Sequence, residues 1–107
     1  MAEWSRVLAL SELPAESIKR VKVGTTPVLL CHTAGVVHAV SDTCSHEDVS
    51  LSFGCLKDGA IKCGYHGSRF CLKTGQPQNE PATAPIPVFH ARINGSMIEV
   101  SLEPPHD

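Results

Sequence analysis

Two short motifs constrain this chain more than any other feature of its sequence. A C-x-H motif occupies residues 44–46 and, after sixteen residues, a C-x-x-H motif occupies residues 63–66. In an extended segment residues i and i+2 point to the same side, so Cys44 and His46 can face one site. Gly64 gives the second motif a backbone that can wrap closely around a bound group. The pattern predicts two loops that bring two sulfurs and two nitrogens to one metal centre.

Two kinds of metal centre accept this donor set. A structural zinc site takes two cysteines and two histidines tetrahedrally, but zinc motifs usually pair like ligands within one knuckle. In a Rieske 2Fe–2S centre two histidines replace two cysteines on one iron, so each loop would give its cysteine to one iron and its histidine to the other. The mixed loops favour the Rieske centre. A zinc-stabilised interaction module is the alternative from another functional class.

Outside these loops the pattern is that of short β-strands separated by turns. Strands are expected where β-branched and other apolar residues recur between Gly, Asn, Asp and Pro signals: residues 4–7, 17–23, 28–32, 36–40, 55–57, 60–62, 69–72, 88–93 and 97–102. Asp58-Gly59 and Asn94-Gly95 are hairpin signals. Residues 10–14 suggest a turn or one helical turn, and no helical periodicity reaches three turns. The prediction is an all-β chain, a small antiparallel β sandwich or barrel.

Composition limits the classes of protein that fit. A chain of 107 residues is expected to form one domain over residues 1–107. It carries 9 Lys and Arg against 11 Asp and Glu, which argues against a nucleic-acid partner. No apolar stretch suits a membrane span or a signal peptide, so we expect a cytoplasmic protein with no membrane association. Five cysteines in such a compartment do not predict a disulfide framework.

At this point the chain resembles a known family, the Rieske-type 2Fe–2S ferredoxins that serve bacterial aromatic ring-hydroxylating dioxygenases. The resemblance extends over nearly the whole chain and is carried most specifically by the two motifs. The residues that carry it are DTCSHEDVSL at 42–51, CGYHGSRF at 63–70, KTG at 73–75 and PATAPIP at 81–87. Phe53 is a departure, because many relatives have an acidic residue there.

The resemblance implies the Rieske fold, a small antiparallel β fold with a two-loop cluster-binding subdomain at about residues 42–84. It implies one Rieske-type 2Fe–2S cluster, with Cys44 and Cys63 on the buried iron and His46 and His66 on the iron nearer to solvent. The proline-rich segment would be a third loop that covers the cluster. High-potential relatives place a Ser and a Tyr hydroxyl against the cluster. Ser68 stands at the first position here and Phe70 at the second, so a potential at the low end is expected.

The resemblance also implies a function. The protein would be a one-electron carrier and not an enzyme. It would take electrons from an NAD(P)H-dependent flavoprotein ferredoxin reductase and pass them to a terminal oxygenase with Rieske and mononuclear iron centres. A monomer is expected. Terminal oxygenases add a large catalytic domain, and respiratory Rieske proteins add a membrane helix and a loop disulfide. The small Rieske subunit of an NAD(P)H nitrite reductase is the alternative function.

The remaining residues of interest receive structural interpretations. Cys31 is expected in the core, and Cys55 and Cys71 are not expected to form a disulfide. His32, His38 and His90 are expected on or beside strands, and residues 103–107 form a loose tail. Partners would dock at the loop tip, with Glu47 and Asp48 as an acidic rim and Lys19 and Lys22 on a distant strand. The candidates for the apolar centre of this tip are Ser45, Val49, Leu51, Tyr65, Gly67 and Pro81.

Overall fold

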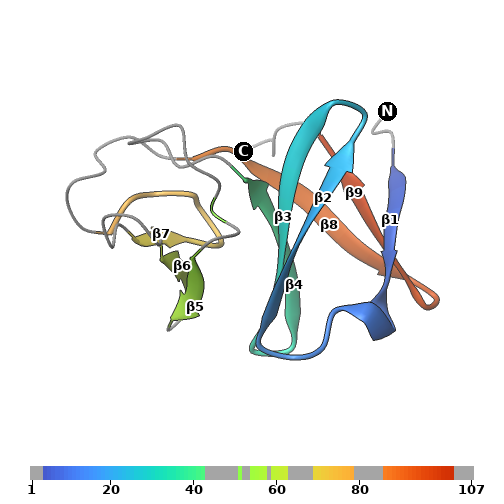
Figure 1. Cartoon of the computed structure of the whole chain (residues 1–107), viewed down its shortest axis with the longest axis horizontal. Coiled ribbons are helices and arrows are strands. Elements are labelled where there is room, and N and C mark those ends of the chain that lie inside the picture. Colours follow the sequence, from blue (N-terminus) through green and yellow to red (C-terminus); the bar gives the residue numbers. More distant parts are fainter. Residues whose placement is uncertain are drawn as a thin grey trace.

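The computed structural model describes residues 4–42, 51, 54–57, 59–62, 69–78 and 86–102. Within these residues it contains two antiparallel sheets (Figure 1). The larger sheet has six strands in the order β1-β9-β8-β4-β3-β2, and the smaller has three in the order β5-β6-β7. The larger sheet is made of β1 (Ser5–Ala9), β2 (Ser17–Val23), β3 (Thr26–Thr33), β4 (Val36–Ser41), β8 (Val88–Asn94) and β9 (Met97–Ser101). The smaller is made of β5 (Cys55–Lys57), β6 (Ala60–Lys62) and β7 (Arg69–Cys71).

The all-β prediction is confirmed, with a nearly closed barrel as its main body. The outer strands β1 and β2 of the large sheet come into contact, which brings the two edges of that sheet together. One 3-10 turn, η1 (Leu10–Glu12), follows β1, where the sequence suggested a turn or one helical turn. No helix in the described part of the chain is long and apolar enough to cross a membrane.

The hairpin turns differ from the predicted ones by one or two residues. Val23 pairs with Thr26, so β3 begins two residues earlier than expected and runs through Pro27. Asn94 pairs with Met97, so the last turn consists of Gly95 and Ser96 instead of Asn94 and Gly95. In each case two-residue turns allow strand pairing to begin at once, and Gly24 and Gly95 supply the positive φ that such turns need.

Strand β3 is buried on both of its faces, which explains its nearly continuous apolar run. Val28 and Leu30 point into the barrel core, together with Leu8, Leu13, Val23, Val37, Ala39, Ile98 and Val100. Leu29 and Cys31 alternate with them and point the other way. There they join a second cluster, here called the interface core, which also contains Val40, Leu51, Ile61, Phe70, Leu72 and Ile86. The interface core attaches the small sheet to the outer face of β3 and β4 (Figure 1).

Candidate metal centre

The four predicted ligands, Cys44, His46, Cys63 and His66, lie outside the described residues. Their positions in the fold follow from the residues that flank them. The first motif falls between Asp42 and Leu51, and the second falls between β6 and β7. The proline-rich segment falls between Gln78 and Ile86. The ends of these three segments are therefore the observable part of the site.

The first segment begins and ends at a pair of residues joined by a hydrogen bond. The Leu51 N–H donates to the Asp42 carbonyl at 2.5 Å, and the Asp42 N–H donates to the Pro27 carbonyl at 3.3 Å. The Asp42 carboxylate is only 2% exposed and accepts a hydrogen bond from Arg20 Nε at 2.8 Å. A buried carboxylate needs such a partner because its desolvation is costly. Asp42 thus ties the start of the segment to β2 and to β3.

The second segment is the connection of a hairpin. Lys62 pairs with Arg69 across β6 and β7, so residues 63–68 leave and re-enter the small sheet at neighbouring positions. Phe70, which follows on β7, is wholly buried in the interface core and pairs with Ile61. The segment that carries Cys63 and His66 therefore begins and ends at a rigid, buried base.

The third segment is fixed at both ends to the other two. The Gln78 N–H donates to the Arg69 carbonyl at 2.7 Å, and the Ile86 N–H donates to the Gly75 carbonyl at 2.9 Å. The Ser41 N–H donates to the Pro87 carbonyl at 2.9 Å, next to the start of the first segment. The ends of the three segments are thus connected to one another through backbone hydrogen bonds.

Gly75 is a position where only glycine fits. Its φ is +77°, a left-handed conformation that side chains disfavour. A Cβ built on it would lie 2.1 Å from the Ile86 carbonyl oxygen and 2.9 Å from a Val88 methyl carbon. The close approach lets the turn after β7 pack against the return of the third segment. This gives the KTG part of the sequence signature a physical role.

All three segments also stand on one apolar cluster. Leu51 ends the first segment, Ile61 and Phe70 flank the second, and Ile86 ends the third; all four are members of the interface core and at most 3% exposed. This is the observation that supports the predicted site: two cysteines and two histidines lie in two segments whose ends share one rigid base. The donor set of two thiols and two imidazoles fits a Rieske 2Fe–2S cluster. The third segment adjoins the same base, as the expected covering loop requires.

Several other predictions are tested by the described residues. Cys31 is wholly buried in the interface core, as expected, and burial raises the pKa of its thiol to about 12. Cys55 and Cys71 are free and lie on β5 and β7, the two strands that flank β6. Strands two apart in a sheet are about 10 Å apart, which is too far for a disulfide.

The three remaining histidines of the strands have structural environments. His32 Nδ1 lies 2.8 Å from the Leu13 carbonyl oxygen. His38 is half-buried on β4 and His90 lies beside Trp4, with 6.4 Å between ring centroids. No group of three or more His, Cys, Asp or Glu residues that could hold a metal ion occurs within the described ranges.

Two predictions about the partner-docking tip are wrong. Leu51 was expected at the apolar centre of the tip, but it is wholly buried because it belongs to the interface core. Lys19 and Lys22 are exposed on β2 as expected, yet this strand is not distant from the site, because Arg20 between them binds Asp42. The other tip candidates, Ser45, Glu47, Asp48, Val49, Tyr65, Gly67 and Pro81, lie outside the described residues.

The sequence reasoning missed the roles of Asp42 and Arg20. Asp42 was included in the first motif only as a neighbour of Cys44. A signal was available: an acidic residue directly after a strongly apolar strand ends in a place where a carboxylate is either solvated or paired. Nothing in the local sequence points to Arg20 as its partner, because 22 positions separate the two residues.

Comparisons with known proteins agree with the donor set. The Rieske [2Fe-2S] domain family model matches residues 3–90. The ferredoxin component of biphenyl 2,3-dioxygenase from Rhodococcus jostii is 33% identical over 92% of both chains. Ferredoxin CarAc of Metapseudomonas resinovorans is 35% identical over 94% of both chains. The 3-phenylpropionate/cinnamic acid dioxygenase ferredoxin subunit of Escherichia coli K12 is 33% identical over 92% of this chain and 94% of its own.

Solved structures give the same result. A chain in the complex of reduced oxygenase and oxidized ferredoxin in carbazole 1,9a-dioxygenase superposes with a TM-score of 0.88 at 33% identity, over 97% of both chains. The ferredoxin of carbazole 1,9a-dioxygenase from Nocardioides aromaticivorans IC177 also gives 0.88, at 27% identity over 92% of this chain and 97% of its own. Dicamba monooxygenase gives 0.85 at 28% identity over 97% of this chain, which spans only 35% of that larger protein.

The relatives of similar length are ferredoxin components, which transfer electrons and leave catalysis to other subunits. The larger relatives are monooxygenases of which this chain matches about a third. The chain therefore belongs to the Rieske [2Fe-2S] domain family, as a ferredoxin-type electron carrier of the aromatic ring-hydroxylating dioxygenase kind with one Rieske-type 2Fe–2S cluster.

Proposed function

We propose that this chain takes single electrons from an NAD(P)H-dependent flavoprotein ferredoxin reductase. It delivers them to a terminal oxygenase that holds a Rieske centre and a mononuclear iron. The relative in complex with an oxygenase supports the second half of this route, and the ferredoxin components among the relatives support the assignment as a separate carrier. The whole chain, residues 1–107, would act as one Rieske domain, as a monomer in the cytoplasm.

We assign the cluster to Cys44 and Cys63 on one iron and His46 and His66 on the other, within a cluster-binding part at about residues 42–84. The observation that carries this assignment is the shared base of the two loop segments in the interface core. When bound, the cluster stores one electron. Two imidazole ligands are neutral where two thiolates would be negative, so the centre accepts an electron more easily than an all-cysteine centre does.

The four ligands also explain why the chain is a carrier. Four side chains from this protein complete the coordination of the two irons, which leaves no open position for an organic substrate or for dioxygen. Electron transfer requires only a close and brief approach of the partner, and small transient interfaces suit this task. The histidine-bearing side of the loops is the proposed exit, with Glu47 and Asp48 at its rim.

Reconstitution tests this function. The purified holoprotein is mixed with NADH or NADPH, a ferredoxin reductase and the oxygenase of an aromatic dioxygenase system, and product formation is followed. We expect turnover that depends on this chain and that disappears in Cys63→Ser. The assignment as a shuttle is wrong if reductase and oxygenase turn over equally well without it, or if the holoprotein accepts no electrons from any flavoprotein reductase tested.

A pair of charge reversals tests the docking side. Glu47→Lys is expected to change the rate of electron transfer to the oxygenase several-fold at low salt, because rim charges act mainly on association. Higher salt should reduce this effect because it screens the charges. Glu12→Lys is the matched control, since Glu12 is exposed on η1 at the end of the barrel away from the small sheet (Figure 1). Equal effects of the two reversals would contradict docking at the loops.

A further inference from the structure

A groove of about 500 Å³ separates the turn between β3 and β4 from the segment that follows β7. Its volume lies within the range of small-molecule sites, about 300–1,000 Å³. The polar side chains that line it offer a thiol, an ammonium, an imidazole, an amide and a hydroxyl, and no carboxylate is among its described lining residues. They are Thr33, His38, Cys71, Lys73 and Gln78.

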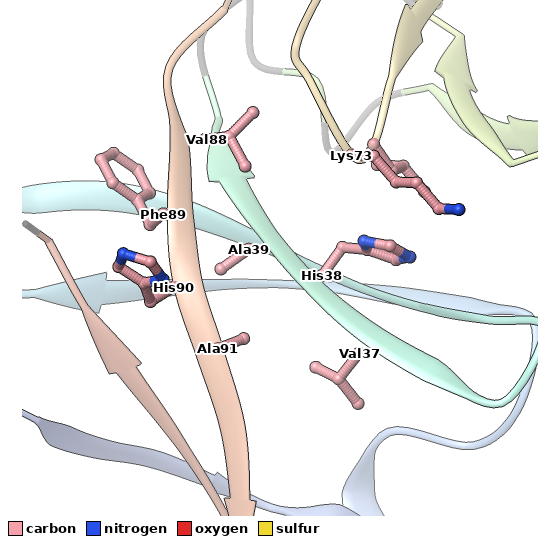
Figure 2. A pocket seen from close by; sticks show the side chains of 9 residues that line it. Val37, His38, Ala39, Lys73, Val88, Phe89, His90 and Ala91 are labelled. Atoms are coloured by element: carbon pink, nitrogen blue, oxygen red, sulfur yellow. The ribbon is translucent and has the colours of Figure 1, made fainter. Parts of the chain in front are cut away.

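Lys73 supplies positive charge to this groove. Figure 2 shows its side chain extending beside the ring of His38, which comes from β4 on the other side of the gap. The same two residues also line a neighbouring cavity of about 300 Å³, the one drawn in Figure 2. The Lys73 charge lowers the pKa of His38, in addition to the larger effect of burial. A ligand that carries carboxylates would therefore meet an attractive potential here.

Cys71 places a thiol in the same groove. The Thr74 side chain and the backbone N–H groups of Lys73 and Thr74 hydrogen-bond to this sulfur, and together with the Lys73 charge they lower the pKa of the thiol. Thr74 Oγ1 accepts a hydrogen bond from the Gln76 N–H at 3.2 Å, which leaves its own proton available for the sulfur. Because the thiolate is the reactive form, Cys71 is prepared for attack on an electrophilic sulfur.

The other free thiols of the chain differ from Cys71. Cys31 is wholly buried and burial raises its pKa to about 12, so it is inert. Cys55 is more exposed than Cys71, but it is not among the residues that line the groove. Exposure alone therefore predicts that Cys55 reacts first, whereas the groove predicts that Cys71 does.

We propose that this groove binds small disulfides that carry carboxylates, of the glutathione disulfide class, and that Cys71 exchanges with them. The Cys71 thiolate attacks one ligand sulfur, a new S–S bond forms to Cys71, and the S–S bond of the ligand breaks. The other half leaves as a thiolate and takes up a proton, so the ligand is the only oxidant. Lys73 holds a carboxylate of the ligand during this exchange. This modification site is separate from the electron-carrier function and does not depend on it.

Mass spectrometry of the holoprotein tests which thiol reacts. Protein with an intact cluster, verified by its visible absorption, is incubated with oxidised glutathione, and the modified cysteine is located by peptide mapping over time. We expect the mixed disulfide on Cys71 several-fold faster than on Cys55, with Cys31 unmodified. Cys71→Ser should remove the fast reaction and Cys55→Ser should leave it. Modification of Cys55 at the same rate as Cys71, or faster, would overturn the proposal.

The role of Lys73 is tested by comparing two disulfides. Oxidised glutathione is anionic, whereas 2-hydroxyethyl disulfide is neutral and reports the reactivity of the thiol alone. We expect Lys73→Met to lower the rate with glutathione several-fold more than the rate with the neutral compound, and added salt to do the same in the unmodified sequence. Equal slowing with both compounds would show that the groove does not recognise the carboxylates, and the binding part of the proposal would be wrong. Lys57→Met, a change on β5 outside the groove lining, should alter neither rate.

Discussion

Arg20 Nε donates a hydrogen bond to a carboxylate oxygen of Asp42 at 2.8 Å, and Asp42 stands two residues before the cluster ligand Cys44 in the sequence. The carboxylate is 2% exposed, while the arginine side chain is 48% exposed. This pair therefore joins an outer strand of the barrel to the start of the first ligand segment. Its loss would leave a carboxylate buried without this partner.

We expect Arg20→Gln to lower the free energy of unfolding by about 1–3 kcal/mol, the usual cost when a buried group loses a charged partner. The cluster should also be lost faster, because the start of the first segment is less well held. Lys19→Gln, on the exposed neighbouring position, is the control and should change little. Urea unfolding and the decay of the visible absorption measure both effects. Equal behaviour of the two variants would show that the pair contributes nothing.

Gly75 offers a second test, because another glycine with the same conformation lacks its close contact. Both Gly75 and Gly35 have φ near +77°, but a Cβ on Gly35 meets nothing within 4 Å. Gly35→Ala should cost about 1–2 kcal/mol for the left-handed conformation alone. Gly75→Ala should cost clearly more and reduce cluster content, because the Ile86 carbonyl must move. If denaturation curves give the two variants the same stability, the close approach has no energetic importance.

His38 links stability to pH. Burial lowers its pKa below the ordinary value of 6.5, and the Lys73 charge lowers it further. Its contribution to stability is therefore present above the ordinary histidine pKa and is lost as the pH falls from there through the folded-state pKa. We expect Lys73→Met to raise the pKa of His38 without restoring the ordinary value, because burial is the larger cause. NMR titration of the His38 ring measures this, and an unchanged pKa in the variant would contradict the coupling.

The reduction potential is expected at the low end of the Rieske range of about −150 to +300 mV. Ser68 supplies one hydroxyl that could reach the cluster, whereas Phe70 supplies none and is wholly buried beneath the ligand segments. Ser68→Ala should lower the midpoint and Phe70→Tyr should raise it, because hydrogen bonds to the sulfurs favour the reduced state. Phe89→Tyr, on β8 in the barrel, is the matched control. A wild-type midpoint well above zero would show that the environment of the cluster is misjudged.

The sequence predicted the strands well because most turns carry unambiguous signals and most strands alternate. The errors arise from pairing. Pro27 looked like part of a turn, yet it lies at the start of β3, where a strand tolerates proline. Leu51 looked like a surface residue of the ligand loop, yet it is buried, because the attachment of the small sheet to β3 and β4 is a tertiary feature with no local pattern.

The ligand motifs could be read directly because their chemistry is local: each places a thiol and an imidazole within four residues. The support of these motifs could not be read in the same way. The pairing of Arg20 with Asp42 and the contact of Gly75 with Ile86 join residues that are distant in the sequence, and only the folded chain brings them together.

The most direct test of the central claim is the count of iron and acid-labile sulfide in the purified protein, with EPR of the dithionite-reduced form. The account predicts two irons and two sulfides per chain and the low-average-g signal of a Rieske centre. It also predicts loss of both in Cys44→Ser, His46→Ala, Cys63→Ser and His66→Ala. One zinc per chain without sulfide, or an intact cluster in any of these four variants, would contradict the assignment of the ligands.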